Sequence, residues 1–325
     1  MRPFDYLRAE SVESACGQVS ATAPAYAGGT DLLTLMKAGL RTPERVVDLK
    51  RSGLSTDIVD DGDRITLGAL VTLGDIERSR MLRARLSALT DAAGLAATPQ
   101  LRHRATIAGN LLQRPRCWYY RTPEVDCWLK GGTGCPARDG RNEHHAIFHD
   151  SPCVAVHPSD LAGPLVALDA VVQLRSTAGT RTLPVAQLLA PPTEERRTEN
   201  VLDEGEIITA IDIDASQPVV STYRKAMDRA AWSFALVGVA VAARFDGERL
   251  DGARIVLSGV ANTPRRATPS EEVLMRSGEL DEMTIERAAT AAAESAAPLS
   301  QNGYKRQLVV AMIRDALAEV GRRHD

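Results

Sequence analysis

The run Ala105-Thr106-Ile107-Ala108-Gly109-Asn110-Leu111 stands directly before an irregular stretch that carries four cysteines, Cys117, Cys127, Cys135 and Cys153. Four thiols in one short segment suit zinc or an iron–sulfur cluster. The small residues at 108 and 109 are typical of a turn that lets a phosphate or a flat ring approach the backbone. A metal site beside a nucleotide site indicates electron transfer.

A second glycine turn, Ala27-Gly28-Gly29-Thr30-Asp31-Leu32, leads from a short predicted strand into a predicted helix. Its bare N–H groups and the positive helix end are suited to an anion, and Thr30 can add its hydroxyl. Asp31 is expected either to cap the helix or to bind a ribose hydroxyl. The turn is not the G-x-G-x-x-G fingerprint, so a Rossmann domain is not indicated. An ordinary glycine turn with an N-cap remains the alternative.

A third candidate is His157-Pro158-Ser159-Asp160, which precedes an apolar run and is also compatible with a simple helix N-cap. Each of the three segments, taken alone, is explained by a turn or a cap. Their order and spacing in one chain favour a common cofactor site.

The composition limits the partners and the class of protein. At 325 residues, the chain is long enough for two or three packed units, and its 4% aromatic content predicts cores built from Ala, Val and Leu. A net charge of -3 gives no reason to expect nucleic acid. The basic cluster Arg102, Arg104, Arg114 and Arg116 is explained equally well by a phosphate-rich cofactor or by an acidic partner face.

Targeting and disulfide signals are not expected. The start Met1-Arg2-Pro3-Phe4-Asp5-Tyr6 has no apolar region of a signal peptide and no twin-arginine pair, and no apolar run is long enough for a membrane span. Five cysteines, an odd number, argue against a disulfide framework. Cys16 is distant from the other four and is expected to be a buried or idle thiol.

Periodicity predicts a small α/β unit over residues 1–55, a strand over 64–70 and helix over most of 81–97. Residues 98–160 have little periodicity, and so long an irregular segment is usually functional. Regular patterns return at 165–174, 180–183 and 207–213. Strands are predicted at 235–245 and 253–260, and helices at 283–296 and 304–322.

These motifs resemble the FAD-binding (medium) subunits of molybdenum hydroxylases, the xanthine dehydrogenase and carbon monoxide dehydrogenase family. The family pattern A-G-G-T-[DN]-L corresponds to residues 27–32, T-[IV]-G-G-N to residues 106–110, and the later S-D to Ser159-Asp160. Ala108 departs from the pattern, where the family has Gly. Tyr223-Arg224-Lys225 and the apolar strand from Ala235 resemble the start of the family's C-terminal domain.

The cysteine segment resembles the subgroup typified by periplasmic aldehyde oxidoreductase. The shared features are Trp118, Tyr119, Gly131-Gly132, Gly134-Cys135-Pro136-Ala137-Arg138 and His145-Ala146-Ile147-Phe148. The resemblance implies a [4Fe-4S] cluster on Cys117, Cys127, Cys135 and Cys153. Their spacing, C-x9-C-x7-C-x17-C, has neither a zinc knuckle nor a ferredoxin run, so spacing alone leaves zinc open.

The resemblance implies an α+β fold. A two-part FAD-binding domain of the PCMH/VAO type would occupy residues 1–218, divided at about residue 55 and carrying the cysteine loop 112–157. A domain similar to the CO dehydrogenase flavoprotein C-terminal domain, with an antiparallel sheet and helices, would occupy residues 219–325. The FAD contacts implied are Ala27, Gly28, Gly29, Thr30, Asp31, Leu32, Thr106, Gly109, Asn110, Ser159 and Asp160. Lys225 is added for the polar edge of the ring, with a solvated lysine at a strand end as its alternative.

The implied function is electron transfer within a complex. A large subunit with the molybdenum cofactor and a small subunit with [2Fe-2S] clusters would be partners, and FAD would pass electrons on to an external acceptor. No acid–base pair or nucleophile stands out, so no catalytic residue is predicted. The alternatives are a zinc-stapled scaffold subunit and a stand-alone flavin reductase. The compartment would be the cytoplasm, or the periplasm by export with a twin-arginine-bearing partner.

Overall fold

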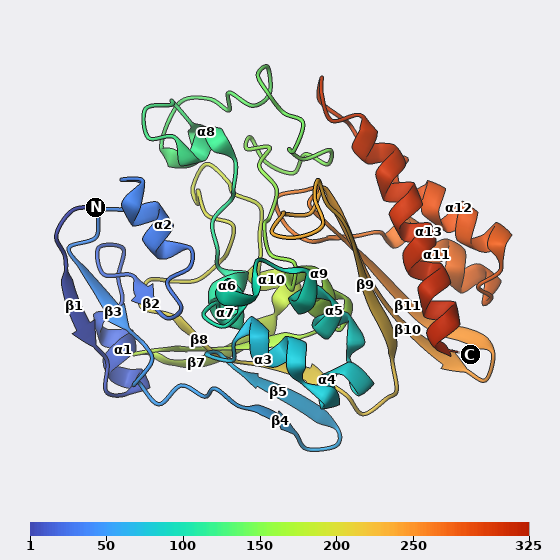
Figure 1. Cartoon of the computed structure of the whole chain (residues 1–325), viewed down its shortest axis with the longest axis horizontal. Coiled ribbons are helices and arrows are strands. Elements are labelled where there is room, and N and C mark those ends of the chain that lie inside the picture. Colours follow the sequence, from blue (N-terminus) through green and yellow to red (C-terminus); the bar gives the residue numbers. More distant parts are fainter. Residues whose placement is uncertain (325) are drawn as a thin grey trace.

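A computed structural model describes residues 1–324 of the chain and contains three sheets (Figure 1). The N-terminal part is a three-stranded parallel sheet in the order β1-β3-β2. Its elements are β1 (Asp5–Arg8), α1 (Val12–Gln18), β2 (Ala25–Tyr26), α2 (Leu32–Lys37) and β3 (Arg45–Asp48). The predicted α/β unit over residues 1–55 is confirmed in this part of the chain.

The second part is a five-stranded antiparallel sheet in the order β4-β5-β8-β6-β7. Its strands are β4 (Ile58–Asp60), β5 (Arg64–Gly68), β6 (Val171–Ser176), β7 (Gly179–Pro184) and β8 (Ile207–Asp214). Helices lie on one face and bury the largest apolar core against it: α3 (Leu73–Arg78), α4 (Arg80–Arg85), α5 (Ser87–Leu95), α6 (Pro99–Arg102), α7 (Ile107–Leu111), α9 (Ala162–Ala167) and α10 (Val185–Leu188).

The C-terminal part is a four-stranded antiparallel sheet in the order β12-β11-β10-β9, covered on one face by three helices. Its elements are β9 (Val220–Ala226), β10 (Val237–Asp246), β11 (Arg249–Ser258), β12 (Arg265–Arg266), α11 (Thr268–Ser277), α12 (Glu282–Ala292) and α13 (Tyr304–His324). The other face of β10 and β11 contributes Ala240, Ala242 and Val256 to the core of the second part. The antiparallel sheet with helices is the architecture expected for this domain.

The differences from the predicted elements are local. The helical span 81–97 is interrupted at Leu86, which is the C-cap of α4 and precedes α5. The predicted strand 253–260 begins earlier, at Arg249, because the tight turn at Asp246-Gly247 lets β11 pair with β10 at once. Helix α11 was not predicted, although Pro269 in its first turn and Gly278 at its C-cap are ordinary start and stop signals.

The cysteine loop 112–157 has only short helical turns, α8 (Trp118–Arg121) and the 3-10 turn η1 (Trp128–Lys130). It lies between α2 and the C-terminal helices in Figure 1. Side-chain bonds attach it at both sides: Arg121 to Asp31 beside α2, and Asn142 to the backbone of Gln301 before α13. The loop therefore follows a fixed path across the molecule.

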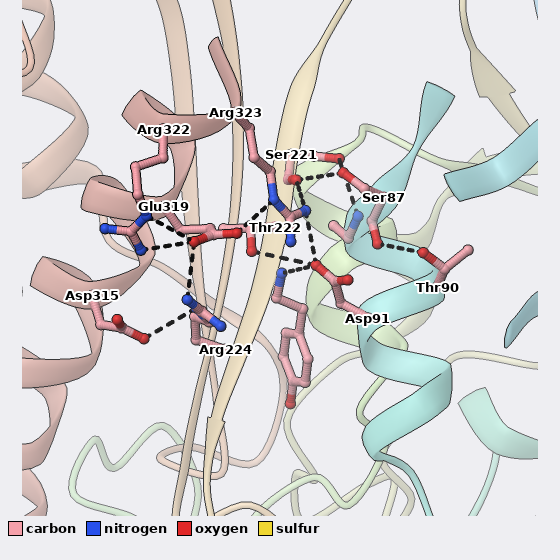
Figure 2. A network of polar contacts seen from close by, with 12 residues as sticks. Ser87, Thr90, Asp91, Ser221, Thr222, Arg224, Asp315, Glu319, Arg322 and Arg323 are labelled. Carbon is pink, nitrogen blue, oxygen red and sulfur yellow. Dashed lines mark hydrogen bonds and ion pairs between the residues drawn. The ribbon is translucent and has the colours of Figure 1, made fainter. Parts of the chain in front are cut away.

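The second and third parts are joined by a polar network across α5, β9 and α13 (Figure 2). Asp91 of α5 accepts hydrogen bonds from Thr222 and from Arg323, and Arg323 also donates to the carbonyl of Ser221. Arg224 of β9 pairs with Asp315 and Glu319 of α13. Helix α13 thus contributes side chains to the interface between the two parts.

Candidate functional site: two cavities and a cysteine cluster

The two glycine turns predicted from the sequence meet at one cavity of about 320 Å³. It is lined by Ala27, Gly28, Gly29, Thr30, Asp31 and Leu32 from the first turn and by Thr106, Ala108 and Gly109 from the second. We call this space cavity 1. Asn110 is not among its lining residues. Ala108, which departs from the family pattern, is one of them.

Gly28 explains why the turns can meet. A Cβ at this position would lie 1.9 Å from the carbonyl oxygen of Arg104, which precedes the second turn. The next residue, Gly29, has φ +72°, a left-handed conformation that strains other residues. Gly28 is therefore required for backbone packing between the two turns, whatever cavity 1 contains.

The capping role predicted for Asp31 is wrong, and its carboxylate contacts the cysteine loop instead. Its side chain makes no capping bond to α2. Its carboxylate instead accepts from the backbone N–H of Arg114 at 2.8 Å and from the guanidinium groups of Arg116 and Arg121. Burial opposes ionisation of Asp31, but the two arginines outweigh it and hold its pKa below the ordinary value. Asp31 thus fixes the start of the cysteine loop to the wall of cavity 1.

Arg41 also lines cavity 1 and was not predicted as a site residue. Burial and the neighbouring Arg114 lower the pKa of its guanidinium. Within residues 1–324 it forms no ion pair. A half-buried cation without a counter-ion, beside two glycine turns, can hold a phosphate. Its position after α2, outside any motif, explains why pattern reading missed it.

A second cavity of about 330 Å³, cavity 2, lies at the junction with the C-terminal part. Its polar lining includes Arg116, Ser159 and Asp160, and its aromatic lining includes Trp118, Trp232 and Phe234. Trp232 and Phe234 are largely exposed on the segment between β9 and β10, and Trp232 has φ +54°. A cavity lined by both aromatic and polar side chains suits a flat ring system with polar edges.

A bond between Ser159 and Asn110 joins the second glycine turn to cavity 2, which Asp160 also borders. Ser159 donates its hydroxyl hydrogen to Asn110 Oδ1 at 2.5 Å and accepts from the N–H of Ala162 at 3.1 Å. Ser159 thus satisfies the N–H of the first residue of α9, although the N-cap position itself is Leu161 and has no side-chain cap. Asp160 is buried and accepts from Lys225 Nζ at 2.7 Å and from the Tyr223 hydroxyl at 2.9 Å.

Lys225 is not a solvated lysine at a strand end. Its side chain is fully buried within β9, and Nζ donates to Asp160 and to the Leu95 carbonyl. It lines neither cavity 1 nor cavity 2. Desolvation raises the pKa of Asp160 above its ordinary value, although Lys225 and Tyr223 act in the opposite direction. Lys225 therefore stabilises the charged form of the carboxylate that borders cavity 2.

Of the four predicted cysteines, Cys117 is part of the lining of cavity 2. The Cys117 thiol is close enough to Cys127 and Cys135 for their charges to affect its pKa, which burial chiefly raises to about 11. A hydrogen bond from Cys153 is the main cause that lowers the pKa of Cys135 to about 6. Within residues 1–324, no three potential metal ligands are close enough to hold a single ion.

The N–H of Ala155 donates to the Cys153 sulfur at 3.4 Å. Backbone N–H groups near the other sulfurs also favour the thiolate and lower the thiol pKa, against burial, which raises it. They belong to Tyr119 and Tyr120 for Cys117, to Leu129 and Lys130 for Cys127, and to Ala137 and Val154 for Cys135. Such bonds stabilise thiolates, the form that binds metals. Cys16 is remote, buried and bonded to the Arg175 carbonyl at 3.3 Å, as expected for an idle thiol.

Fold and site define a flavoprotein. The family model described as "FAD binding domain in molybdopterin dehydrogenase" matches residues 2–215, and the "CO dehydrogenase flavoprotein C-terminal domain" matches residues 221–320. The chain belongs to the FAD-binding subunits of the molybdenum hydroxylases, which are oxidoreductase subunits. No helix within residues 1–324 has the length and hydropathy to cross a membrane.

Two relatives illustrate the similarity. The chain is 35% identical to the aldehyde oxidoreductase FAD-binding subunit PaoB of Escherichia coli K12, over 98% of each chain. It is 28% identical to the carbon monoxide dehydrogenase medium chain of Hydrogenophaga pseudoflava, over 81% of this chain and 77% of that one. A solved carbon monoxide dehydrogenase from the same organism superposes with a TM-score of 0.78 at 26% identity, covering 99% of both chains.

Proposed function

We propose that the chain is the electron-transfer subunit of a molybdenum-dependent aldehyde oxidoreductase complex and carries both FAD and a [4Fe-4S] cluster. Its partners would be a molybdenum-cofactor subunit and a [2Fe-2S] subunit, with an external acceptor receiving the electrons. The similarity to an aldehyde oxidoreductase subunit over 98% of the chain supports the substrate class. The observation that carries the proposal is that Cys117 lines the same cavity as Ser159 and Asp160.

The lining of the two cavities fits the two ends of FAD. The glycine turns and Arg41 around cavity 1 would hold the pyrophosphate by backbone N–H groups and by charge. The aromatic and polar lining of cavity 2 would hold the flavin ring, with Asp160 as a hydrogen-bond acceptor that Lys225 and Tyr223 keep in place. When bound, FAD supplies the ability to take up electrons singly and release them in pairs.

A cluster is proposed over a single zinc ion because of the neighbouring flavin site. Four cysteines suit either metal, and within residues 1–324 no three potential ligands are grouped closely enough for one ion. A redox cluster beside cavity 2 would have a flavin with which to exchange electrons, whereas zinc would be redox-inactive there. Zinc is the alternative that the metal count below tests.

The position of the cysteines favours a conducting role over a purely bracing one. Cys117 borders cavity 2, whereas Cys127 borders an open surface cleft that also includes Lys130, Gly131 and Gly132. The cysteine set therefore extends from the proposed ring site to the outer surface. An acceptor that docks at this cleft would be separated from cavity 2 by the cysteine set itself.

The test is anaerobic purification of the intact complex, with iron, zinc and flavin counts and low-temperature EPR after dithionite. We expect one FAD and about four irons beyond those of the [2Fe-2S] partner. Cys127→Ser should remove the corresponding EPR signal and slow turnover with the external acceptor, with flavin content retained. Cys16→Ser is the matched control and should change neither.

Three other results would contradict parts of the proposal. Zinc without the extra iron would make the cysteine loop a structural clip. Unchanged turnover of Cys127→Ser would remove the cluster from the electron path. A fully active flavin reductase that purifies without large or small subunits would exclude the proposed complex.

A further inference from the structure

A buried histidine contacts the cysteine set without belonging to it. His145 Nε2 lies 3.2 Å from the Cys117 sulfur, and the residue is 2% exposed. Its ring packs edge-on against Trp118, with centroids 5.3 Å apart. His145 also lines cavity 2, together with Cys117 and Asp160. The His145 side chain therefore lies next to both the cysteine set and the proposed ring site.

The backbone around His145 is held firmly. Its N–H donates to the Asn142 carbonyl, and its own carbonyl accepts from Asn302 Nδ2 and from Lys305 Nζ, both at 3.1 Å. Lys305 is fully buried and donates to the carbonyls of His144 and Gly259 as well. The C-terminal part thus fixes the position of this imidazole relative to Cys117.

The hydrogen-bond partners available to the two ring nitrogens of His145 select its tautomer. Nδ1 is buried and has no hydrogen-bond partner among residues 1–324. If the ring proton is on Nε2, Nδ1 is an acceptor without a partner. If the proton is on Nδ1, that atom is a buried N–H donor without a partner, which is the rarer arrangement in proteins. A sulfur that has lost its proton to bind metal can only accept. The contact is then an N–H···S bond from His145 to Cys117.

We propose that His145 is a positioning residue. It donates a hydrogen bond to Cys117, the cluster ligand that faces cavity 2, and thereby raises the reduction potential of the cluster. The inference rests on the proposed cluster. Hydrogen bonds to ligand sulfurs stabilise the more negative, reduced form and so shift the potential upward. His145 thereby favours transfer of electrons from the flavin side into the cysteine set.

The experiment is an EPR-monitored redox titration of the cluster in the intact complex, together with iron counts and the resonance Raman Fe–S(Cys) stretch. His145→Gln places an amide nitrogen near the position of Nε2 and should keep the wild-type potential. His145→Met and His145→Asn lack a donor there. We expect them to reduce the equilibrium constant for cluster reduction on the order of tenfold, about 59 mV for a one-electron couple.

His144→Met is the matched control, because His144 also packs against Trp118 and lines cavity 2 but makes no contact with a thiol. It should leave the potential unchanged. Full iron content with the wild-type potential and Raman stretch in both His145→Met and His145→Asn would overturn the inference. If His145→Met loses iron, the comparison of His145→Gln with His145→Asn decides. Wild-type protein without the extra iron would instead refute the proposed cluster, a failure that the iron count identifies before any variant is compared.

Discussion

Gly28 shows how a single residue can be required by the protein before any ligand is considered. Gly28→Ala puts a methyl carbon 1.9 Å from the Arg104 carbonyl oxygen, so one of the two turns must move. We expect a loss of most bound flavin and a fall in stability of about 1–3 kcal/mol, the usual cost of overpacking. Flavin-to-protein ratio and thermal denaturation measure the two effects.

Gly321→Ala is the control for the same chemical change, since nothing lies within 4 Å of the added carbon and the residue is in helix α13. It should be neutral or slightly stabilising, because Ala is the better helix former. A Gly28→Ala protein with full flavin content would mean that the turns separate freely and that their contact does not shape cavity 1.

Among the elements, β9 and the segment before α9 are connected by the buried pair Lys225–Asp160. Lys225→Met leaves the Asp160 carboxylate buried with only Tyr223 beside it, which should cost roughly 3–5 kcal/mol near neutral pH. Because burial already raises the pKa of Asp160, the folded state holds its proton more tightly than the unfolded state. Stability from this group therefore decreases as pH rises above the ordinary Asp value of about 3.9.

The deficit of Lys225→Met relative to wild type should accordingly be larger at pH 8 than at pH 5, measured by urea denaturation at both values. In the double variant Asp160→Asn, Lys225→Met, no buried carboxylate remains, and this pH dependence should disappear. An equal deficit at both pH values would show that Asp160 keeps its charge without help from Lys225.

At the scale of the whole molecule, the network in Figure 2 joins the flavin-binding part to the C-terminal part. A double-mutant cycle with Arg323→Ala and Asp91→Ala should give a coupling energy of about 1 kcal/mol, since both side chains are only partly exposed and belong to a network. The exposed pair Arg276–Glu272, within α11, should give about 0.3–0.5 kcal/mol or less. Equal coupling in the two cycles would deny the network any special role in joining the parts.

The sequence allowed only part of the candidate site to be predicted. The glycine turns could be predicted because each motif is short and local, and the structure brings both to cavity 1. The metal-binding role of the four cysteines stays a prediction. Arg41, His145 and the Asp160–Lys225 pair could not be assigned in the same way, because their roles depend on contacts between residues far apart in the chain. The capping role of Asp31 was wrong for a related reason: the carboxylate pairs with arginines far away in the chain, which a local capping rule does not consider.

The anchorage of the cysteine loop on Asp31 has a thermodynamic consequence. The same carboxylate borders cavity 1 and holds Arg116 and Arg121 on either side of Cys117. Flavin binding in cavity 1 and order in the cysteine loop are therefore linked. Linkage is reciprocal: if a metal-bound loop raised the affinity for flavin by some factor, bound flavin would raise the affinity of the loop for its metal by the same factor. Maturation of such a protein would be cooperative, with each prosthetic group easing the insertion of the other.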